Sequence, residues 1–269
     1  METRINKFLA DRGIASRRAI DELIAQKRIA VNGAILEQPG VKVSETDVVT
    51  VDGKQIEEKM HTHEYVLFNK PADCITTASD THGRKTVLDY VKIDVRVFPV
   101  GRLDKNTTGV LLLTNDGDLA NMLMHPRYSV EKVYRVGLDK LFTERDRKRF
   151  EGGIMLDDKK TAPCKAQYFH NEKRDIFVTL HEGRNRQIRR MFNALGYAVE
   201  KLDRTSYAGL TAGRLKRGEW RYLTKKEVDM LRKRFQMTNR CDRIIEPVEK
   251  YQLCLSSGSL LSTFAPNQR

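Results

Sequence analysis

The first 36 residues contain two short runs in which apolar side chains recur at helical spacing. Ile5, Phe8 and Leu9 fall on one side of a helix that Gly13 is placed to end. Ser16 can cap a second helix, whose apolar positions 20, 23 and 24 form its buried side. The pattern therefore predicts two amphipathic helices at the N-terminus.

Short extended segments follow these helices. Two apolar runs, residues 29–31 and 34–36, are separated by Asn32-Gly33, a dipeptide that favours a tight hairpin turn. Another short strand, residues 48–51, stops at a second turn pair. We therefore expect residues 1–60 to form one compact module, and the charged residues 61–64 to be a linker.

From Tyr65 the pattern changes to longer apolar strands separated by helices. The predicted strands are residues 65–68, 95–100, 110–113, 133–138, 176–180 and 199–202, and the predicted helices lie near residues 118–124, 145–150, 185–195 and 225–235. Because strands and helices do not alternate strictly, the pattern favours an α+β domain over residues 65–236, with a largely antiparallel mixed sheet flanked by helices. The serine-rich residues 237–269 lose the periodicity and are predicted to be a disordered tail.

The distribution of charge points to a polyanionic partner. The 269 residues include 49 Lys or Arg and 36 Asp or Glu, giving a formal net charge of +13. Residues 1–36 hold seven basic and four acidic side chains, and residues 182–221 hold ten and four. Two separated basic segments fit a long anion better than a small acidic metabolite, although a generally basic, solvated surface would give the same counts.

The motifs that are missing exclude several function classes. The sequence contains no phosphate loop of the form GxxxxGK[ST], no GxGxxG dinucleotide turn and no HExxH metal motif. The four cysteines form no CxxC pair, and His61 and His63 stand in the linker without further ligands. No apolar run approaches the ~18–20 residues that span a bilayer, and no signal sequence is visible. We therefore expect a cytoplasmic protein that uses neither a cofactor nor a metal.

Two segments carry side chains suited to chemistry. In the loop of residues 101–109, an extended backbone would place Arg102 and Asp104 on one face, although Asp104 taken alone is most simply a turn or capping residue. In the basic segment of residues 182–192, helical spacing puts apolar side chains on one side and arginines on the other. Guanidinium groups on such an anchored helix suit phosphate contact or the fixing of a carboxylate, whereas a solvated face is the plainer alternative.

Several blocks, in this order, resemble the signature segments of bacterial ribosomal RNA pseudouridine synthases. The blocks are Phe68–Pro71, Val100–Asp104, Glu131–Tyr134, Glu182–Met191 and Leu202–Arg204. The sequence is most similar to the small-subunit uridine synthase group, and the loop continuation at residues 105–117 looks closest to the large-subunit synthase B branch. The N-terminal module resembles the RNA-binding domain shared with ribosomal protein S4.

The resemblance implies an enzyme that converts a uridine within RNA to its C-glycoside isomer. It implies that Asp104 is the catalytic carboxylate, which either attacks C1′ or removes the 2′ proton. Tyr134 would stack on the flipped base and assist loss of the C5 proton, and Arg189 would keep Asp104 ionised. Leu202 would line the floor of the base pocket.

Ribosomal RNA is then the expected partner, as a stem-loop of 23S rRNA or a pre-ribosomal particle, bound by a monomer. The residues expected to contact RNA are basic: Arg4, Lys7, Arg17, Arg18, Lys27, Arg28, Lys70, Arg102, Arg184, Arg186 and Arg190. For Lys70 and Arg102, holding the loop around Asp104 is the alternative to touching RNA. A non-catalytic RNA-binding or ribosome-assembly factor with the same fold is the alternative function, and another RNA modifier such as a methyltransferase would need a glycine-rich cofactor loop.

Overall fold

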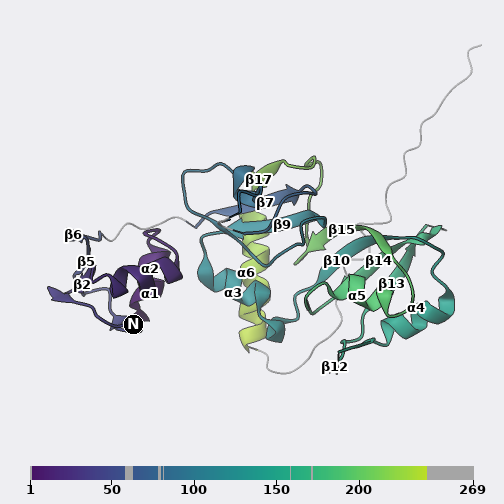
Figure 1. Cartoon of the computed structure of the whole chain (residues 1–269), viewed down its shortest axis with the longest axis horizontal. Helices are drawn as coiled ribbons and strands as arrows, with labels where there is room; N and C mark the ends of the chain where they lie inside the picture. The colour runs from purple at the N-terminus through teal and green to yellow at the C-terminus, as the bar shows by residue number, and fades with distance from the viewer. Residues whose placement is uncertain are drawn as a thin grey trace, which may run out of the picture.

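The computed structural model describes residues 2–57, 63–77, 80, 82–157, 159–170 and 172–240. A small N-terminal module stands beside a larger domain built on one sheet (Figure 1). The module contains β1 (Thr3–Arg4), α1 (Ile5–Asp11), α2 (Arg17–Ala25), β2 (Ile29–Val31), β3 (Ala34–Ile35), β4 (Lys42–Val43), β5 (Val49–Val51) and β6 (Lys54–Gln55). The two predicted helices and the hairpin are therefore confirmed.

The core of the module is the one that the helical spacing predicts. Ile5, Leu9 and Ile20 are fully buried together, and β2 and β5 add apolar side chains to the same cluster. Ser16 caps α2 by accepting a hydrogen bond from the backbone N–H of Ala19 at 3.1 Å. Basic side chains are thereby left on the outside of the module.

The larger domain contains the elements that position the candidate site. Its strands are β7 (Tyr65–Lys70), β8 (Phe98–Pro99), β9 (Thr108–Thr114), β10 (Lys132–Leu138), β11 (Met155–Leu156), β12 (Lys159–Lys160), β13 (Lys165–Phe169), β14 (Glu172–Leu180), β15 (Val199–Tyr207), β16 (Leu210–Thr211) and β17 (Trp220–Tyr222). Its helices are the 3₁₀ turns η1 (Val87–Asp89) and η2 (Pro126–Tyr128) and the α-helices α3 (Gly117–Met124), α4 (Glu144–Glu151), α5 (Gln187–Asn193) and α6 (Lys225–Arg240).

One mixed sheet organises this domain, as the sequence predicts. Within the described residues its order is β13-β14-β10-β15-β9-β7-β17, with β16 beside β15 and β8 beside β9. All of these neighbours pair antiparallel except β15 and β9, which run parallel. The parallel pair joins the two halves of the sheet at its centre.

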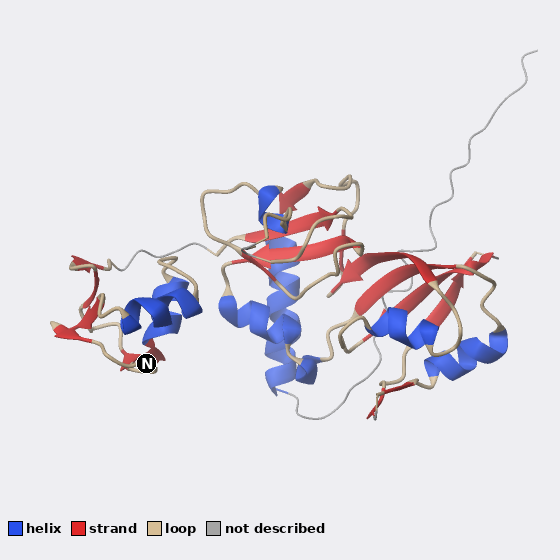
Figure 2. Ribbon diagram, in the orientation of Figure 1, coloured by secondary structure: helices blue, strands red, loops and turns tan. Residues whose placement is uncertain are grey.

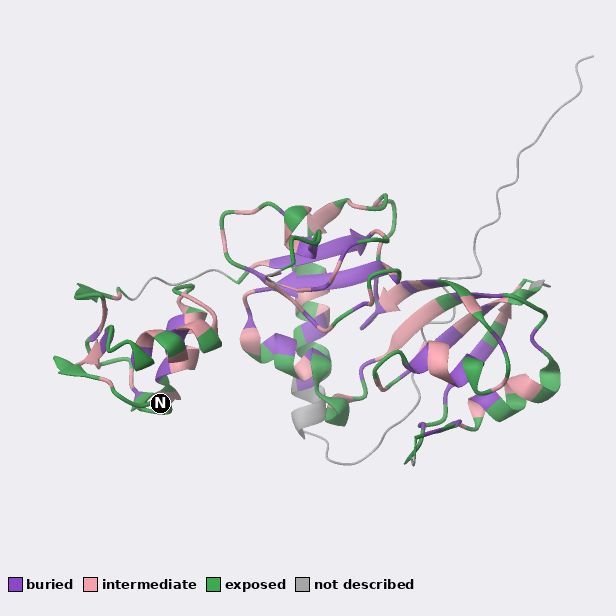
Figure 3. Cartoon of the chain, viewed as in Figure 1, coloured by how far each residue is buried: buried purple, intermediate pink, exposed green. Residues whose placement is uncertain are grey.

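Helices cover the two halves separately (Figure 2). In one half, Phe150 of α4 and Phe192 of α5 pack into the cluster formed by β10, β13 and β14. In the other half, α3 and α6 pack against β7 and β9, with Leu231 and Phe235 of α6 in the core. Figure 3 shows β7 and β9 as the most buried strands, which agrees with the complete burial of Leu67 and Leu112.

The structure differs from the predicted elements where apolar periodicity gives little information. The strand predicted at residues 95–100 is reduced to β8, and β15 extends five residues beyond its predicted end at Leu202. β13 was not predicted, because only its second residue, Ala166, is fully buried and the strand is short. Helix α6 continues to Arg240, past the domain end predicted at residue 236, and the rest of the predicted tail, residues 241–269, lies outside the described residues.

Candidate active site

Asp104 lies on the loop between β8 and β9, and this loop is held on its inner side. Leu103 is buried, and its N–H and carbonyl both bond to the hydroxyl of Thr76, at 3.2 and 2.8 Å. The backbone N–H of Thr107 donates to the Asp104 carbonyl at 3.0 Å and closes a turn. The side chain of Asp104 remains 36% exposed, so its carboxylate is fixed at its base and open on its outer side.

Lys70 anchors the same loop from below. Its side chain is completely buried, and Nζ donates to the backbone carbonyls of Pro71, Lys105 and Thr107 at 2.9, 3.0 and 3.0 Å. Burial lowers the pKa of this ammonium group, while the nearby Cys74 and Asp104 act in the opposite direction. The prediction that Lys70 contacts RNA is wrong in this structure, because its amino group is enclosed by the loop; the alternative, that Lys70 holds the loop, fits.

Helix α5 brings arginines to the open side of Asp104. Ile188, Met191 and Phe192 anchor the helix in the core, as the spacing predicts. The helix begins at Gln187 instead of residue 185, because Arg186 has a left-handed backbone with φ of +47° and forms the N-cap. Arg186 reaches the loop of Asp104 from this position.

The direct partner of Asp104 is Arg186. One guanidinium nitrogen of Arg186 lies 3.7 Å from Oδ2 of Asp104. Arg189, the partner expected from the sequence, instead donates to the carbonyl of Val199 at 2.7 Å. Burial lowers the pKa of Arg189, and the neighbouring Arg186 lowers it further, whereas Asp104 raises it. Both arginines therefore act on the carboxylate, but only Arg186 is within ion-pair distance.

A cavity of about 280 Å³ lies beside these arginines. It is lined by Arg186, Arg189, Arg190, Asn193, Tyr197, Ala198 and Val199. Three guanidinium groups around one hollow favour an anionic occupant, such as the phosphate of a nucleic acid. The cavity lies along α5, and the arginines that line it include Arg186, the partner of Asp104.

Tyr134 and Leu202 lie on the strands that pass beneath this region. Tyr134 on β10 packs against the cluster that contains Leu103, the residue before Asp104, and also against the cluster under α5. Leu202 on β15 is 7% exposed and stands opposite Val136 of β10. The structure thus brings the predicted tyrosine and leucine together with the loop and helix that carry the charged groups.

Two further arginines that were expected to contact RNA have protein partners. Arg184 donates to the carbonyls of Lys159 and Lys160 at 2.8 and 2.6 Å and so holds the β11–β12 hairpin. Arg190 pairs with Asp157 of the same hairpin at 2.5 Å. Arg102 is exposed on the loop.

Some basic residues of the N-terminal module are exposed, and others form ion pairs. Arg4, Arg17 and Arg18 are exposed. Three others form ion pairs: Lys7 with Asp118 at 2.6 Å, Lys27 with Glu37 at 2.7 Å and Arg28 with Asp52 at 2.6 Å. Exposed pairs of this kind contribute little and exchange readily with a phosphate.

Sequence analysis did not identify three residues close to this site. Thr76 lies in a stretch without apolar periodicity, so no pattern marked it. Lys132 and Arg204 stand inside two of the blocks quoted above, but spacing alone gave no reason to expect either to be buried. In the structure Arg204 is only 3% exposed and lies opposite Tyr134.

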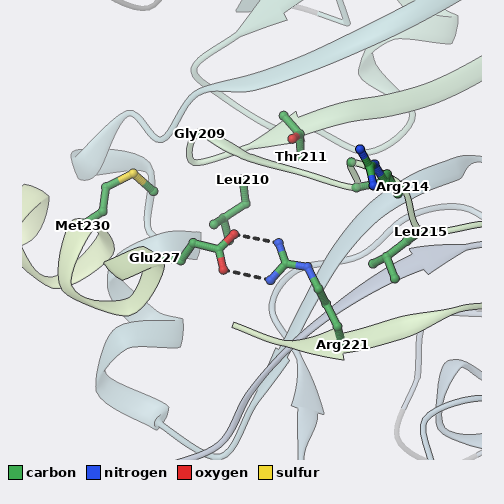
Figure 4. A pocket seen from close by; sticks show the side chains of 10 residues that line it. Gly209, Leu210, Thr211, Arg214, Leu215, Arg221, Glu227 and Met230 are labelled. Atoms are coloured by element: carbon green, nitrogen blue, oxygen red, sulfur yellow. Dashed lines mark hydrogen bonds and ion pairs between the residues drawn. The ribbon is translucent and has the colours of Figure 1, made fainter. Parts of the chain in front are cut away.

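A second cavity, of about 490 Å³, lies elsewhere, between the loop after β15 and the start of α6 (Figure 4). Arg221 and Glu227 face each other across it in a two-pronged ion pair, with distances of 2.8 and 2.7 Å. This pairing lowers the pKa of Glu227 to about 2. No predicted site residue lines this cavity, and its strongest charges already neutralise each other.

Metal ligands and membrane spans were also sought in the described part of the chain. Within it, no group of three or more His, Cys, Asp or Glu side chains could hold a metal ion. His63 belongs to this part, but His61 lies outside it. None of the described helices is long and apolar enough to cross a bilayer.

Comparison with known proteins adds independent evidence. The family model for RNA pseudouridylate synthase matches residues 64–194, and that for the S4 domain matches residues 3–49. The ribosomal large subunit pseudouridine synthase B of Bacillus subtilis (strain 168) is 44% identical over 234 residues, which are 85% of this chain and 95% of the relative. The dual-specificity RNA pseudouridine synthase RluF of Escherichia coli (strain K12) is 38% identical, covering 84% of this chain and 77% of that protein.

A solved structure shares the architecture. A crystal structure of a pseudouridylate synthase superposes with a TM-score of 0.63 at 29% identity, over 85% of this chain and 99% of the other. The similarity therefore spans both the N-terminal module and the domain that carries Asp104.

Proposed function

This chain belongs to the RNA pseudouridine synthase family, and from that premise we propose that it isomerises a specific uridine of 23S ribosomal RNA, with Asp104 acting on the ribose. The chain is an enzyme whose substrate is RNA. The choice of large-subunit RNA is supported by the Bacillus relative, whose name specifies the large ribosomal subunit. We propose that the enzyme acts as a monomer in the cytoplasm, on a 23S stem-loop or a pre-ribosomal particle.

The observation that carries the assignment of Asp104 is its combination of rigid support and open carboxylate. Thr76 and Lys70 fix the backbone on both sides of the residue. Arg186 lies 3.7 Å from the carboxylate, and Arg189 acts on it from further away. Guanidinium groups beside a carboxylate balance its negative charge and can donate hydrogen bonds to it.

Such an anion suits the chemistry of glycosidic bond cleavage. The bond between N1 and C1′ breaks, and its electron pair leaves with the uracil ring. An anionic carboxylate stabilises the positive charge at C1′ by attack, as in retaining glycosidases, or removes the 2′ proton to give a glycal. After the ring rotates, C5 bonds to C1′, the C5 proton leaves, and N1 takes up a proton. The net reaction moves one bond and transfers no electrons between molecules.

The surrounding residues have matching proposed roles. Tyr134 stacks on the everted base and assists removal of the C5 proton, and Leu202 forms the floor of the pocket. The partly buried tyrosine and the nearly buried leucine on adjacent strands support these roles. Eversion of a paired base costs a few kcal/mol, and phosphate contacts to the S4 module and α5 offset this cost.

Full-length 23S and 16S rRNA, transcribed without modification, provide the test. Each RNA carries tritium at C5 of uridine and is incubated with enzyme without any added cofactor or metal. We expect tritium release from 23S RNA that reaches the equivalent of one uridine, with pseudouridine at one mapped position. Release from 16S RNA alone would contradict the substrate assignment, and release from neither RNA, naked or in pre-ribosomal particles, would contradict the activity.

A further inference from the structure

Arg204 is a buried arginine without a carboxylate partner. Its side chain is only 3% exposed. Nε donates to the carbonyl of Val110 at 2.7 Å, and the guanidinium carbon lies 4.6 Å from the centre of the Tyr207 ring. Its Nη2 is buried and has no hydrogen-bond partner. None of the ion pairs in the described residues includes Arg204.

A second cation lies next to it. Lys132 on β10 donates to the carbonyl of Val130 at 2.9 Å, and its amino group lies 5.9 Å from the same tyrosine ring. Burial lowers the pKa of Lys132 to about 8, Arg204 lowers it as well, and Glu182 acts in the opposite direction. Two positive groups are therefore held near each other in a largely desolvated place.

The pairing of strands sets these cations beside the proposed base pocket. Arg204 stands directly opposite Tyr134 in the antiparallel pair of β10 and β15, and Leu202 stands opposite Val136 two residues further along. Side chains that are directly opposite share one face of a sheet. On its other side Arg204 pairs with Gly109, which follows the loop of Asp104. The guanidinium thus lies between the tyrosine strand and the end of the catalytic loop.

This arrangement is unfavourable for the protein alone. A buried N–H without a partner lowers the stability of the folded protein, and so does a buried charge without an opposite charge. Among the described residues, one other buried side-chain atom lacks a partner, the hydroxyl of Thr107 on the loop that follows Asp104. The two residues are close along the sheet, because Arg204 pairs with Gly109, two residues after Thr107. Unsatisfied buried groups beside a proposed site indicate that something outside the protein satisfies them.

We propose that Arg204, assisted by Lys132, stabilises the negative charge of the uracil ring after the bond between N1 and C1′ breaks. This inference rests on the proposed function. The electron pair of the broken bond leaves with the ring, where N1 and the two carbonyl oxygens share the charge. The unpaired N–H and the two positive groups balance that charge until C5 bonds to C1′ and the C5 proton departs.

The timing of the charge separates this role from phosphate binding. A backbone phosphate is negative before and after the reaction, so a group that binds it changes the affinity for RNA. The uracil ring is negative only between cleavage and rejoining, so a group that stabilises it lowers the barrier of the chemical step. The two roles therefore predict losses in different kinetic constants.

The experiment compares Arg204→Met and Arg204→Lys with the unaltered enzyme in single-turnover reactions on 23S RNA. The control is Arg135→Met, since Arg135 is the next residue along β10 from Tyr134 and forms an exposed ion pair with Asp175. We expect Arg204→Met to lower the rate constant about 10- to 100-fold, the value of one charge-assisted hydrogen bond, while RNA affinity stays within about twofold. The rate constant of Arg204→Lys should lie between those of Arg204→Met and the unaltered enzyme, and that of Arg135→Met should equal that of the unaltered enzyme.

A second substrate distinguishes stabilisation of the ring from a structural role. RNA with 5-fluorouridine at the target carries an electron-withdrawing atom, which itself stabilises the ring anion. After the reaction, the RNA is digested to nucleosides, which are separated by chromatography. The disappearance of 5-fluorouridine measures cleavage of the glycosidic bond at the target position. We expect both Arg204 variants to lose about tenfold less activity on the fluorinated RNA than on uridine RNA. Equal losses on the two substrates, or a loss confined to affinity, would overturn the inference, whereas inactivity of the unaltered enzyme would instead overturn the proposed function.

Discussion

Arg186, the N-cap of α5, and Arg189, within the helix, interact differently with the carboxylate of Asp104. Arg186 is 55% exposed and pairs with Asp104 at 3.7 Å, a distance that leaves the pair easy to separate. Arg189 is tied to the carbonyl of Val199 and is held closer to the core. We infer that Arg186 exchanges Asp104 for an RNA phosphate when substrate binds, and that Arg189 keeps its position throughout the reaction.

Replacement of Arg189 by lysine tests this division. A lysine cannot both donate to the Val199 carbonyl and extend a second N–H towards Asp104, because it lacks the planar fork. We expect kcat for Arg189→Lys to fall about 10- to 100-fold, with little change in KM. Arg190→Lys on the same helix is the control and should affect KM more than kcat. If Arg189→Lys lost as much RNA affinity as turnover, Arg189 would only contact a phosphate, and the proposed division would be wrong.

The half-buried side chain of Lys132 makes stability depend on pH. Its pKa of about 8 lies below the ordinary value of 10.5, so between these values the unfolded chain binds more protons than the folded one. Folding stability from this group is therefore lowest below pH 8 and rises towards pH 10.5. The variant Lys132→Met has no titrating group at this position, so it lacks this pH dependence of stability. We expect the variant to unfold at a higher temperature than the unaltered protein at pH 7, and this advantage to shrink by pH 10; a constant difference would contradict the pKa.

At this scale the sequence identified the chemical groups better than their contacts. The block at residues 100–104 led to the prediction of Asp104, which the structure places on a loop beside Arg186, and the pairing of β10 and β15 agrees with a tyrosine and a leucine on neighbouring strands. The burial of Lys70 and Arg204 could not be predicted, because basic residues are usually exposed and only tertiary packing encloses these two. The exchange of partner from Arg189 to Arg186 depends on the left-handed backbone at Arg186, which no spacing rule anticipates.

At the scale of elements, the loop of Asp104 is held by one buried lysine. Lys70 satisfies three backbone carbonyls that would otherwise lack a donor. We expect Lys70→Met to lower the free energy of unfolding by about 2–4 kcal/mol and to lower kcat with little effect on KM. Urea unfolding and steady-state kinetics measure the two effects.

Lys105→Met is the matched control for that change. Lys105 lies on the same loop, but its amino group forms only an exposed pair with Asp73 at 3.5 Å. Exposed pairs contribute about 0–1 kcal/mol, so the control should remain stable and active. If Lys70→Met behaved like Lys105→Met, the loop would not depend on Lys70.

The elements themselves were predicted where periodicity and capping agree. Thr224 and Glu227 form the reciprocal bonds of a capping box, at 2.8 and 3.3 Å, and α6 begins at Lys225, where the predicted helix begins. β15 was predicted four residues long because its second half alternates polar side chains, whose burial depends on β9 and β10 on either side. Tertiary pairing, which the local pattern does not contain, set the length of this strand.

At the scale of the molecule, two basic surfaces on separate units are available to one RNA. The S4 module touches the larger domain through exposed contacts, the ion pair of Lys7 with Asp118 and a hydrogen bond from Arg96 to the Ala15 carbonyl. Arg17 and Arg18 stay exposed on α2. The composition of the sequence predicted two basic regions, whereas the spatial relation of the regions required coordinates.

Deletion of residues 1–60 tests the contribution of the module. We expect KM for 23S RNA to rise and kcat at saturating RNA to stay nearly constant, because Asp104 and its supports lie outside the deleted part. The dependence of log affinity on log salt should become shallower by about 0.7 for each lost phosphate contact to single-stranded RNA. Joint replacement of Arg17 and Arg18 by alanine should reproduce part of both effects. An unchanged KM and salt dependence would remove the binding role of the module.

The most direct test of the account is the behaviour of Asp104→Asn on tritiated 23S RNA, measured in a single turnover at saturating enzyme. Asp203→Asn is the matched control, since Asp203 accepts a bond from Thr108 at the end of the same loop and pairs with Arg217. We predict that Asp104→Asn binds RNA, unfolds at the same temperature as the unaltered enzyme and releases no tritium above background, while Asp203→Asn keeps measurable activity. Tritium release by Asp104→Asn at the unaltered rate would contradict the central role of this carboxylate.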